Sequence, residues 1–373
     1  MQRNLFNYLK KKIGKDKYLD LEKFLNVILY DKKYGFYNTI DKTNGELIGN
    51  KGHFITGPEI SQLFGELIGV WVLELCKNNK FKNINLIELG PGKGTLMSDV
   101  LRVLSRQNKS LKITIHLLEF SDKLKSFQTE TLKKFNFSVL WYKDIFKLKY
   151  KLNNNPTIII SNEFFDCLPI NQFKFYKSKN IFTKVIIKLN ENKFSFDEKL
   201  LKDQEVPIIC KNLTNNPDNL KDETIIEYSG LISSYVDEIC KIILNNNGAN
   251  LIIDYGKENP FGSTIQSVYK NQKSNFFDHI GQSDYSSLVD FKNIKNIVEG
   301  NNLLFYSLKT QKDFLLDMGI NSRIENLSLN STILERRELM SGYERLISKR
   351  QMGEIFKVNC FAKKNVVVPI FKV

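Results

Sequence analysis

The chain has 373 residues, of which 42% are hydrophobic and 26% charged, and this composition is typical of an ordinary globular protein. No apolar run approaches the roughly 20 residues that span a bilayer, and the five scattered cysteines, with no C-x-x-C pair, argue against a disulfide frame or a zinc site. The formal charge of +14 comes from lysines spread along the chain without an aromatic-rich ribonucleoprotein motif. We therefore expect no nucleic-acid partner, no metal and no transmembrane segment.

The first twenty residues mix lysines with acidic and aromatic side chains. A secretory signal would show a continuous apolar core there, and a transit peptide would be rich in arginine and poor in acids. Because neither pattern is present, the sequence predicts a cytoplasmic protein.

Residues 1–80 are predicted to form a helical extension that packs on the core. Apolar residues recur at helical spacing over 21–30. A second helix is expected to begin at Thr56 and continue to Cys76, because Pro58 suits its first turn and Glu59 stands at the capping-box position after Thr56.

From residue 81 the pattern alternates between strands and helices. Strands are predicted at 86–89, 113–119, 138–141 and 157–161, with helices at 96–104 and 122–135. Strands that alternate with helices predict an α/β fold with a mostly parallel, doubly wound, Rossmann-like sheet.

This alternation is interrupted after residue 171. Short alternating runs predict a β-rich insertion over 172–224, and the core then resumes with a helix at 231–244 and strands at 250–254 and 354–361. The core therefore comprises 81–171 and 225–373. We expect the insertion, and the segment 261–306, to recognise a substrate or partner.

A glycine-rich loop follows the first core strand and opens a helix. It reads Glu88-Leu89-Gly90-Pro91-Gly92-Lys93-Gly94. Glycines let a backbone turn sharply and approach a ligand, and the helix that follows presents its N–H groups to that ligand. The loop is a candidate cofactor site through Glu88, Gly90, Pro91, Gly92 and Gly94, although a plain strand-to-helix turn could also use these glycines.

Polar residues end the next three strands as well. Glu119 ends the second strand and could accept hydrogen bonds from both hydroxyls of a ribose. Asp144 follows the third strand and could accept from an adenine amino group, and Asn162 ends the fourth. The tips of parallel strands meet at one crevice, so together these residues predict a nucleoside site.

The loop does not match the dinucleotide fingerprint G-x-G-x-x-G, because the third glycine comes one residue early and Thr95 takes its place. Glu88 stands directly before the loop, where an acid suits a cationic ligand better than a pyrophosphate. Both features favour S-adenosyl-L-methionine as cofactor. A dinucleotide-dependent oxidoreductase remains as the alternative that would use the same loop and Glu119.

Several motifs resemble those of the MidA-like methyltransferase family. They are Tyr34-Gly35-Phe36-Tyr37, the run from Gly52 to Glu66, the glycine loop extended to Thr95-Leu96, the run from Asn162 to Pro169, Ile253-Asp254-Tyr255-Gly256, and the run from Met352 to Val358. The resemblance spans residues 30–360. It implies a Rossmann-like class I methyltransferase and, by analogy with a mitochondrial member, methylation of an arginine in a respiratory complex I subunit during assembly.

An arginine acceptor needs carboxylates that localise its charge, since arginine stays protonated at physiological pH. We expect Glu163 and Asp166 to act on the acceptor beside the transferred methyl group, with Asn162 fixing the cofactor or the substrate. The structural alternative is that Asp166 caps a turn and Glu163 pairs with a lysine. A non-catalytic binding factor on the same fold is the second functional alternative.

Glu59, Gln62 and Glu66 share one face of the helix expected after Thr56, by their spacing of three and four residues. They could close over the cofactor or contact the partner, or they could be capping and solvated residues. Glu227, in Glu227-Tyr228-Ser229-Gly230, corresponds to a Glu-x-Ser-Pro pattern of the resembling family and is a candidate substrate contact.

Overall fold

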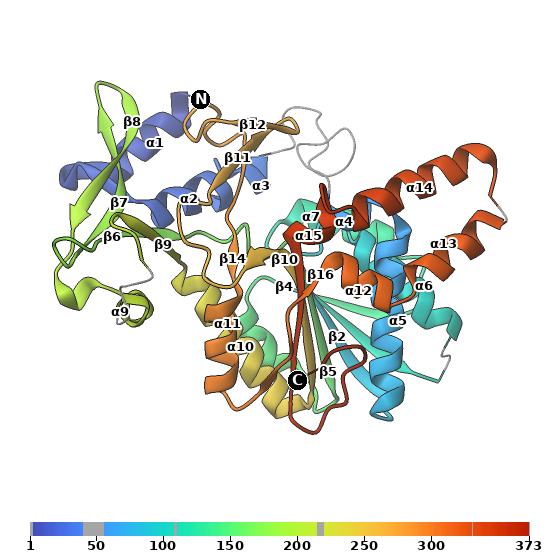
Figure 1. Ribbon diagram of the computed structural model, residues 1–373. Coiled ribbons are helices and arrows are strands. Elements are labelled where there is room, and N and C mark those ends of the chain that lie inside the picture. Colours follow the sequence, from blue (N-terminus) through green and yellow to red (C-terminus); the bar gives the residue numbers. More distant parts are fainter. Residues whose placement is uncertain (1–2, 40–55, 108–109, 215–219, 330, 373) are drawn as a thin grey trace.

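A computed structural model describes residues 3–39, 56–107, 110–214, 220–329 and 331–372 (Figure 1). Residues 52–55, the first part of one family motif, lie outside the described residues. The largest sheet has the order β15-β17-β10-β5-β2-β3-β4. Its parallel strands are β2 (Asn83–Leu89), β3 (Lys112–Leu118), β4 (Ser138–Tyr142), β5 (Thr157–Asn162) and β10 (Gly248–Lys257), with β17 (Phe356–Ala362) antiparallel to β10. Three two-residue strands complete it: β14 (Val289–Asp290), β15 (Leu304–Phe305) and β16 (Lys309–Thr310). This arrangement confirms the predicted Rossmann-like fold.

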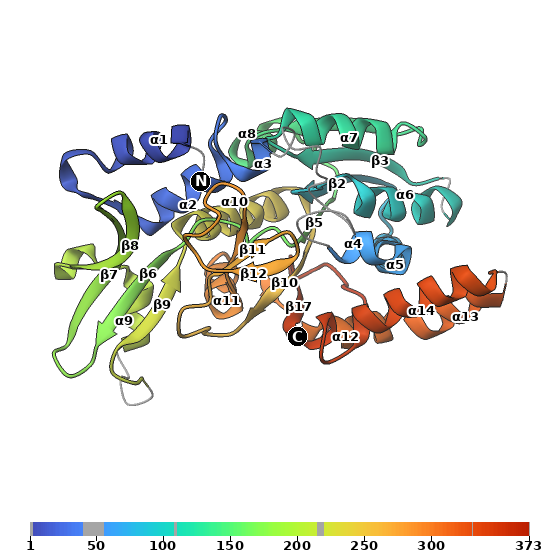
Figure 2. The same ribbon diagram turned by 90° about the horizontal axis from the view of Figure 1, so that it is seen from above.

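Helices cover both faces of this sheet (Figure 2). Successive residues of β5 show why: Ile158 and Ile160 belong to one apolar core, whereas Ile159 belongs to the other. The first core also contains α5 (Gln62–Asn78), α6 (Thr95–Gln107) and α12 (Gln311–Asp317), and the second contains α8 (Ile145–Leu148), α10 (Gly230–Asn246) and α11 (Phe291–Gly300). Helix α7 (Asp122–Leu132) adds Leu132 to the first core.

The strand order reverses at β2, with β3 and β4 on one side and β5 and β10 on the other. In register, Leu89 lies opposite both Leu118 and Ser161, and Asn162 lies opposite Ile253. The segments that follow β2, β3 and β5 therefore leave the sheet at one edge, which is where open α/β sheets bind ligands.

A second, antiparallel sheet lies beside the Rossmann-like part (Figure 1). Its order is β1-β7-β6-β9, and β8 pairs with β7. It consists of β1 (Tyr18–Asp20), β6 (Asn171–Tyr176), β7 (Ile181–Asn190), β8 (Lys193–Leu200) and β9 (Thr224–Tyr228), with α9 (Ile208–Thr214) between the last two. Strands β6, β7 and β8 of the expected insertion are thus joined by β1 from the N-terminal segment and by β9, most of which was assigned to the core from residue 225.

The N-terminal helices pack on this second sheet and on a small third one. The helices are α1 (Arg3–Ile13), α2 (Leu21–Tyr30) and α3 (Phe36–Thr39), and the third sheet is β12-β11-β13 with β11 (Gln266–Tyr269), β12 (Gln272–Ser274) and β13 (Asp284–Ser286). They share an apolar core that includes Phe24, Ile187 and Tyr285.

The helix predicted from Thr56 to Cys76 is in fact two helices. Helix α4 (Gly57–Ile60) ends before Ser61, which has an extended backbone. The Ser61 hydroxyl accepts a hydrogen bond from Leu63 N and caps the start of α5. The Thr56 side chain makes no capping hydrogen bond. Serine is a strong N-cap residue, so the chain turns at Ser61.

Among the helices that were not predicted, three lie near the C-terminus. Helix α13 (Ile320–Leu329) and α14 (Ile333–Ile347) form a hairpin that extends away from the sheet, and α15 (Met352–Ile355) precedes β17 (Figure 1). Among the residues described, none of the helices combines the length and the apolar character needed to cross a membrane.

Candidate functional site

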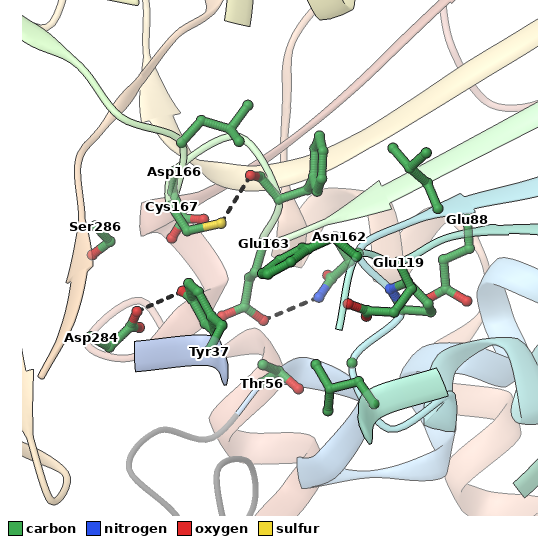
Figure 3. Close-up of a pocket in the computed structure, with 18 of the residues that line it drawn as sticks. Tyr37, Thr56, Glu88, Glu119, Asn162, Glu163, Asp166, Cys167, Asp284 and Ser286 are labelled. Carbon is green, nitrogen blue, oxygen red and sulfur yellow. Dashed lines mark hydrogen bonds between the residues drawn. The ribbon is translucent and has the colours of Figure 1, made fainter. Parts of the chain in front are cut away.

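A cavity of about 390 Å³ opens at the sheet edge where β2, β3 and β5 end (Figure 3). The glycine loop, Glu119 and the segment after β5 line it from the Rossmann-like part. Tyr30, Tyr37 and Asp284 line it from the N-terminal helices and the third sheet. After the predicted roles of Glu119 and Glu163, we call the part around Glu88 and Glu119 the cofactor end, and the part around Glu163, Asp166 and Asp284 the acceptor end.

The glycine loop has the backbone that its sequence requires. Gly90, Gly92 and Gly94 have φ values of +64°, +53° and +81°, where a side chain would be strained. A Cβ on Gly90 would lie 2.8 Å from Cδ2 of Phe164. The loop therefore stays close to the segment after β5 only because glycine occupies this position.

Glu88 is buried at the floor of the cofactor end, with 3% of its surface exposed. Its Oε2 atom has no hydrogen-bond partner within the described chain. Burial, and then the nearby Glu119, raise the pKa of Glu88 to about 8. An unpaired, buried acceptor of this kind fits a ligand that brings a positive charge or a donor.

Glu119 is held by a network that reaches the glycine loop. Its Oε1 accepts from Ser121 N at 2.8 Å, and its Oε2 accepts from Gln128 Nε2 at 3.1 Å. The same Gln128 amide donates to Gly92 O at 2.8 Å, and its oxygen accepts from Trp141 Nε1 at 2.9 Å. Burial raises the pKa of Glu119 to about 7. Gln128 was not predicted; its only signal is a polar residue among the apolar positions of a helix.

Asp144 does not line the cavity, contrary to the prediction that it binds adenine. Its Oδ1 instead accepts from Phe146 N at 2.9 Å and caps α8. Aspartate is a favoured N-cap residue, and this local role directs its carboxylate to the helix. The neighbouring Lys143 lines the cavity at this strand tip.

At the acceptor end, Glu163 has a left-handed backbone conformation, with φ at +49°. A non-glycine residue in this region is rare and is often found at functional sites. Its Oε1 accepts from Gly57 N at 3.2 Å and from Asn162 Nδ2 at 3.1 Å (Figure 3). Burial raises the pKa of Glu163 to about 8. Neither a lysine nor an arginine pairs with Glu163 among the described residues, so the alternative of a lysine pair is not supported.

Asp166 follows three residues later and is held by its backbone. Asp254, at the tip of β10, accepts hydrogen bonds from the amides of Phe164, Phe165 and Asp166 at 3.2, 2.9 and 3.4 Å. Asp166 itself is 6% exposed, and its Oδ1 has no partner in the described chain. Burial, and then the charges of Asp254, Glu163 and Asp284, raise the pKa of Asp166 well above its usual range.

Two tyrosines and an aspartate complete the acceptor end and were not predicted. Tyr30 donates to Cys167 O at 2.7 Å, and Tyr37 donates to Asp284 Oδ1 at 2.7 Å (Figure 3). Tyr37 belongs to the family motif over residues 34–37, and this motif was the one sequence feature that pointed to it. Asp284 lies in the segment 261–306, which was expected to recognise a substrate or partner, but no periodic pattern singled out this residue within it.

Glu59 lines the cavity, where its Oε1 accepts from Thr95 Oγ1 at 2.5 Å. Gln62 and Glu66 do not line it, because they lie on α5 beyond the break at Ser61. The expected shared lid face is therefore corrected: Glu59 belongs to a different helix from the other two.

Glu66 instead is buried and forms ion pairs with two partly exposed arginines of other helices. Its Oε1 lies 3.2 Å from Nη1 of Arg102 on α6, and its Oε2 lies 2.9 Å from Nε of Arg323 on α13. Gln62 accepts from the same Arg102 at 3.1 Å. These residues join α5 to α6 and to the helical hairpin.

Glu227 also lies away from the cavity lining. Its Oε1 accepts from Gln172 Nε2 at 2.8 Å and from Thr264 N at 2.9 Å, and its Oε2 accepts from the Thr264 hydroxyl. Three bonds to its own chain give this carboxylate a structural role in place of the expected substrate contact.

The cavity is acidic although the chain is basic. Six carboxyl residues line it, namely Glu59, Glu88, Glu119, Glu163, Asp166 and Asp284, against the two lysines Lys93 and Lys143. No group of His, Cys, Asp and Glu that could hold a metal ion occurs in the part of the chain that the structure describes. A cavity of this charge suits organic cations.

Residues 67–307 match a protein family described as "Putative S-adenosyl-L-methionine-dependent methyltransferase". Curated relatives include the proteins named "Protein arginine methyltransferase NDUFAF7, mitochondrial". The one from Xenopus tropicalis is 30% identical over 95% of this chain and 84% of its own length. The human one is 28% identical over 96% of this chain and 82% of its own length.

Solved structures show the same fold. A Burkholderia thailandensis protein crystallised with S-adenosyl-homocysteine has a TM-score of 0.81, with 20% identity over 96% of this chain and 92% of its own. A second structure from the same organism has a TM-score of 0.78, with 19% identity over 96% of this chain and 91% of its own.

The predicted cytoplasmic location is wrong. The curated relatives from zebrafish, frog and human are all named mitochondrial. The composition of the first twenty residues was a misleading guide, because it tests only for common leader patterns.

Proposed function

Because the chain belongs to the family of S-adenosyl-L-methionine-dependent methyltransferases, we propose that it methylates an arginine side chain of a partner protein. Family membership confirms the predicted enzyme class, the predicted cofactor and the resemblance seen in the motifs. It does not favour the alternative of a dinucleotide-dependent oxidoreductase. The arginine acceptor is supported by the names of the curated relatives and by the carboxylates of the acceptor end.

The cofactor end fits S-adenosyl-L-methionine in two respects. Buried acceptors without partners in the described chain, Glu88 Oε2 and Asn162 Oδ1, match a ligand that brings donors and positive charge. The space beside Gly90 is kept open by the absence of a Cβ. We propose that the glycine loop and Glu88 hold the amino-acid part and that Glu119 accepts from the ribose hydroxyls. When bound, the cofactor supplies a methyl group on a sulfonium.

In the proposed mechanism, Glu163 and Asp166 act on the acceptor. Glu163 Oε1 is fixed by Gly57 and Asn162, which leaves Oε2 to orient a guanidinium nitrogen. Burial raises the pKa of Glu163 to about 8 in the free protein, and a bound guanidinium favours the ionised carboxylate, which can then take up the proton that the nitrogen loses. Asp166 Oδ1 localises the remaining charge. The single observation that carries this proposal is the pair of acidic side chains, both lining the cavity next to the cofactor end.

We propose that the partner is a mitochondrial protein and that a respiratory complex I subunit is the first candidate, as the family resemblance implies. The third sheet and the segment after β5 border the acceptor end and are the surfaces that this partner would meet.

Labelled S-adenosyl-L-methionine tests the proposal directly. The full chain is incubated with a mitochondrial extract, and the labelled peptides are identified by mass spectrometry. We expect label on arginine in few proteins and none with Glu163→Gln. Label on another residue type would refute the arginine acceptor, and cofactor binding without any labelled protein would favour a non-catalytic binding factor.

A further inference from the structure

We propose that Asp284, held in place by Tyr37, is a specificity-determining residue that supplies a third carboxylate to the acceptor guanidinium. This inference rests on the proposed function, because it assigns a residue to the acceptor end of the same cavity. It brings the third sheet and the N-terminal helices into substrate recognition, although both lie outside the Rossmann-like part.

The carboxylate of Asp284 is anchored through one oxygen only. Its Oδ1 accepts from the Tyr37 hydroxyl at 2.7 Å and from Tyr285 N at 3.0 Å. Its Oδ2 makes no hydrogen bond within the part of the chain that the structure describes. Asp284 lines the cavity and faces the acceptor end in Figure 3. One oxygen therefore fixes the side chain, and the other is left for a ligand.

Asp284 lies close to two other carboxylates that also lack full pairing. Its charge acts on both Glu163 and Asp166. The Oδ1 atom of Asp166, a side chain only 6% exposed, is buried without a partner in the described chain. In that part of the chain no lysine or arginine forms an ion pair with any of the three. Carboxylates that are buried close together without a cation are costly to ionise, and a bound positive charge would offset that cost.

A guanidinium is the cation that suits this arrangement. It is planar and presents five N–H donors in fixed directions, whereas an ammonium is a compact charge with three rotatable donors. Glu163, Asp166 and Asp284 come from separate positions around the cavity, on the segment after β5 and on β13. A ligand with donors on several sides can bond to all three, so Asp284 would add selectivity for arginine.

Tyr37 is the positioning residue in this scheme. Its hydroxyl is the one side-chain group of the described chain that donates to Asp284. Without this bond, the carboxylate could turn away from the cavity. The tyrosine is thereby expected to act on the acceptor through Asp284 rather than by contact.

A pair of bisubstrate analogues tests the proposal without a known partner. Both carry adenosine, linked through its 5′ position to an alkyl chain that ends in a guanidine in one compound and in a neutral urea in the other. The ratio of their dissociation constants, measured by calorimetry on the full chain, reports recognition of the positive group alone. We expect wild type to prefer the guanidine by at least tenfold, and Asp284→Asn to lower this preference about tenfold, as for a lost charged hydrogen bond.

Asp290→Asn is the matched control. Asp290 lies six residues further along the same segment, caps α11 through Lys292 N at 2.9 Å and Asn293 N at 3.3 Å, and does not line the cavity. Asparagine caps as well as aspartate, so the control should keep the wild-type preference. An equal loss in Asp290→Asn would overturn the proposal, because it would show a general effect of the segment.

The outcomes separate this inference from the proposed function. A wild-type chain that binds both analogues equally well has no guanidinium site, and the proposed function fails. A wild-type preference that persists unchanged in Asp284→Asn overturns the inference alone. If that variant does not fold, Tyr37→Phe decides: a preference reduced about threefold supports the inference, and an unchanged preference overturns it.

Discussion

The two ends of the cavity are built in different ways. At the cofactor end, one continuous stretch from β2 to β4 supplies the glycine loop, Glu119 and Gln128, and the Gln128 amide binds both the loop and the acid. At the acceptor end, carboxylates come from distant parts of the chain, and Asp166 and Asp284 each keep an oxygen without a partner among the described residues. At the first end, the network that fixes the loop and Glu119 is formed without a ligand, and Glu88 Oε2 is left for the cofactor. At the second end, carboxylates from distant segments are left for the acceptor.

This difference separates the binding of the cofactor from the chemistry at the acceptor. A preformed cofactor end keeps the affinity for the cofactor independent of the acceptor. An acceptor end with uncompensated carboxylates costs stability in the free protein, and this cost is offset when a cation enters. Changes at one end should therefore leave the other largely intact.

The largest effect is expected from Glu163→Gln. The variant keeps the shape of the side chain but removes its charge and its ability to take up a proton. Single-turnover transfer of labelled methyl should fall by roughly 10²- to 10⁴-fold, while the dissociation constant of S-adenosyl-L-methionine stays within about twofold. The exposed Glu325→Gln on α13 is the control and should change neither. If methyl transfer and cofactor affinity fell by the same factor, the conclusion that the two ends act independently would be wrong.

Gly90→Ala should damage the cofactor end. Alanine is strained at φ +64°, and its Cβ would lie 2.8 Å from Phe164. We expect a loss of roughly 1–3 kcal/mol in the free energy of unfolding and a cofactor affinity at least about tenfold lower. Gly300→Ala meets no atom within 4 Å and serves as control. Denaturant unfolding and calorimetry measure both quantities. Normal cofactor affinity in Gly90→Ala would show that close approach of the loop is not needed.

The affinity for S-adenosyl-L-methionine should rise with pH. Burial raises the pKa of Glu88 to about 8 and that of Glu119 to about 7, so both lose protons between pH 6 and 9. The ionised forms attract the permanent charge of the sulfonium. Calorimetry over this range should show a gain of roughly tenfold, since one pKa unit corresponds to a tenfold change. S-adenosyl-homocysteine lacks that charge and should gain less; equal gains would exclude these carboxylates as the cause.

The stability of the free protein should change in the opposite direction. An unfolded glutamate loses its proton near pH 4.5, whereas the buried Glu88 and Glu163 keep theirs to about 8. The folded state therefore binds more protons in this window, and the free energy of unfolding falls as the pH rises from 4.5 towards 8. Glu163→Gln should weaken this dependence, which urea unfolding at several pH values would show.

The smallest effect is expected from Gln62→Ala. Its side chain contacts Arg102 at the molecular surface and is remote from both ends of the cavity. We expect kcat and KM to change less than about twofold, and stability to change within about 0.5 kcal/mol. Steady-state kinetics would check this. A large change would restore the lid role that was expected for this face.

The cofactor end could be predicted from the sequence because its signals are local. The glycine loop, its strand and its helix are contiguous, and Glu88 and Glu119 end strands whose β-branched residues were readily recognised. Asp144 shows the limit of this reasoning: the end of a strand fixes where a residue lies but not which way it points, and a helix N-cap took the side chain.

The acceptor end and the helical hairpin could not be predicted in the same way. Asp284 meets Tyr37 across 247 residues of sequence, and no pattern of spacing reveals such a contact. Glu66 pairs with Arg323 of α13, which lies 257 residues later in the sequence, so this ion pair could not be inferred from α5 alone. In both cases tertiary packing between distant segments decides what a polar residue does.

The hydrogen bond between Tyr37 and Asp284 can form only late in the synthesis of the chain, because the two residues lie 247 positions apart. A nascent chain that has emerged to residue 200 already contains the strands whose tips line the cofactor end, but the ribosome has yet to make Asp254 and Asp284. Newly made protein should therefore acquire catalytic competence only late in translation, when the third sheet reaches the helices made first. Premature termination after β9 would leave a fragment unable to assemble the acceptor end.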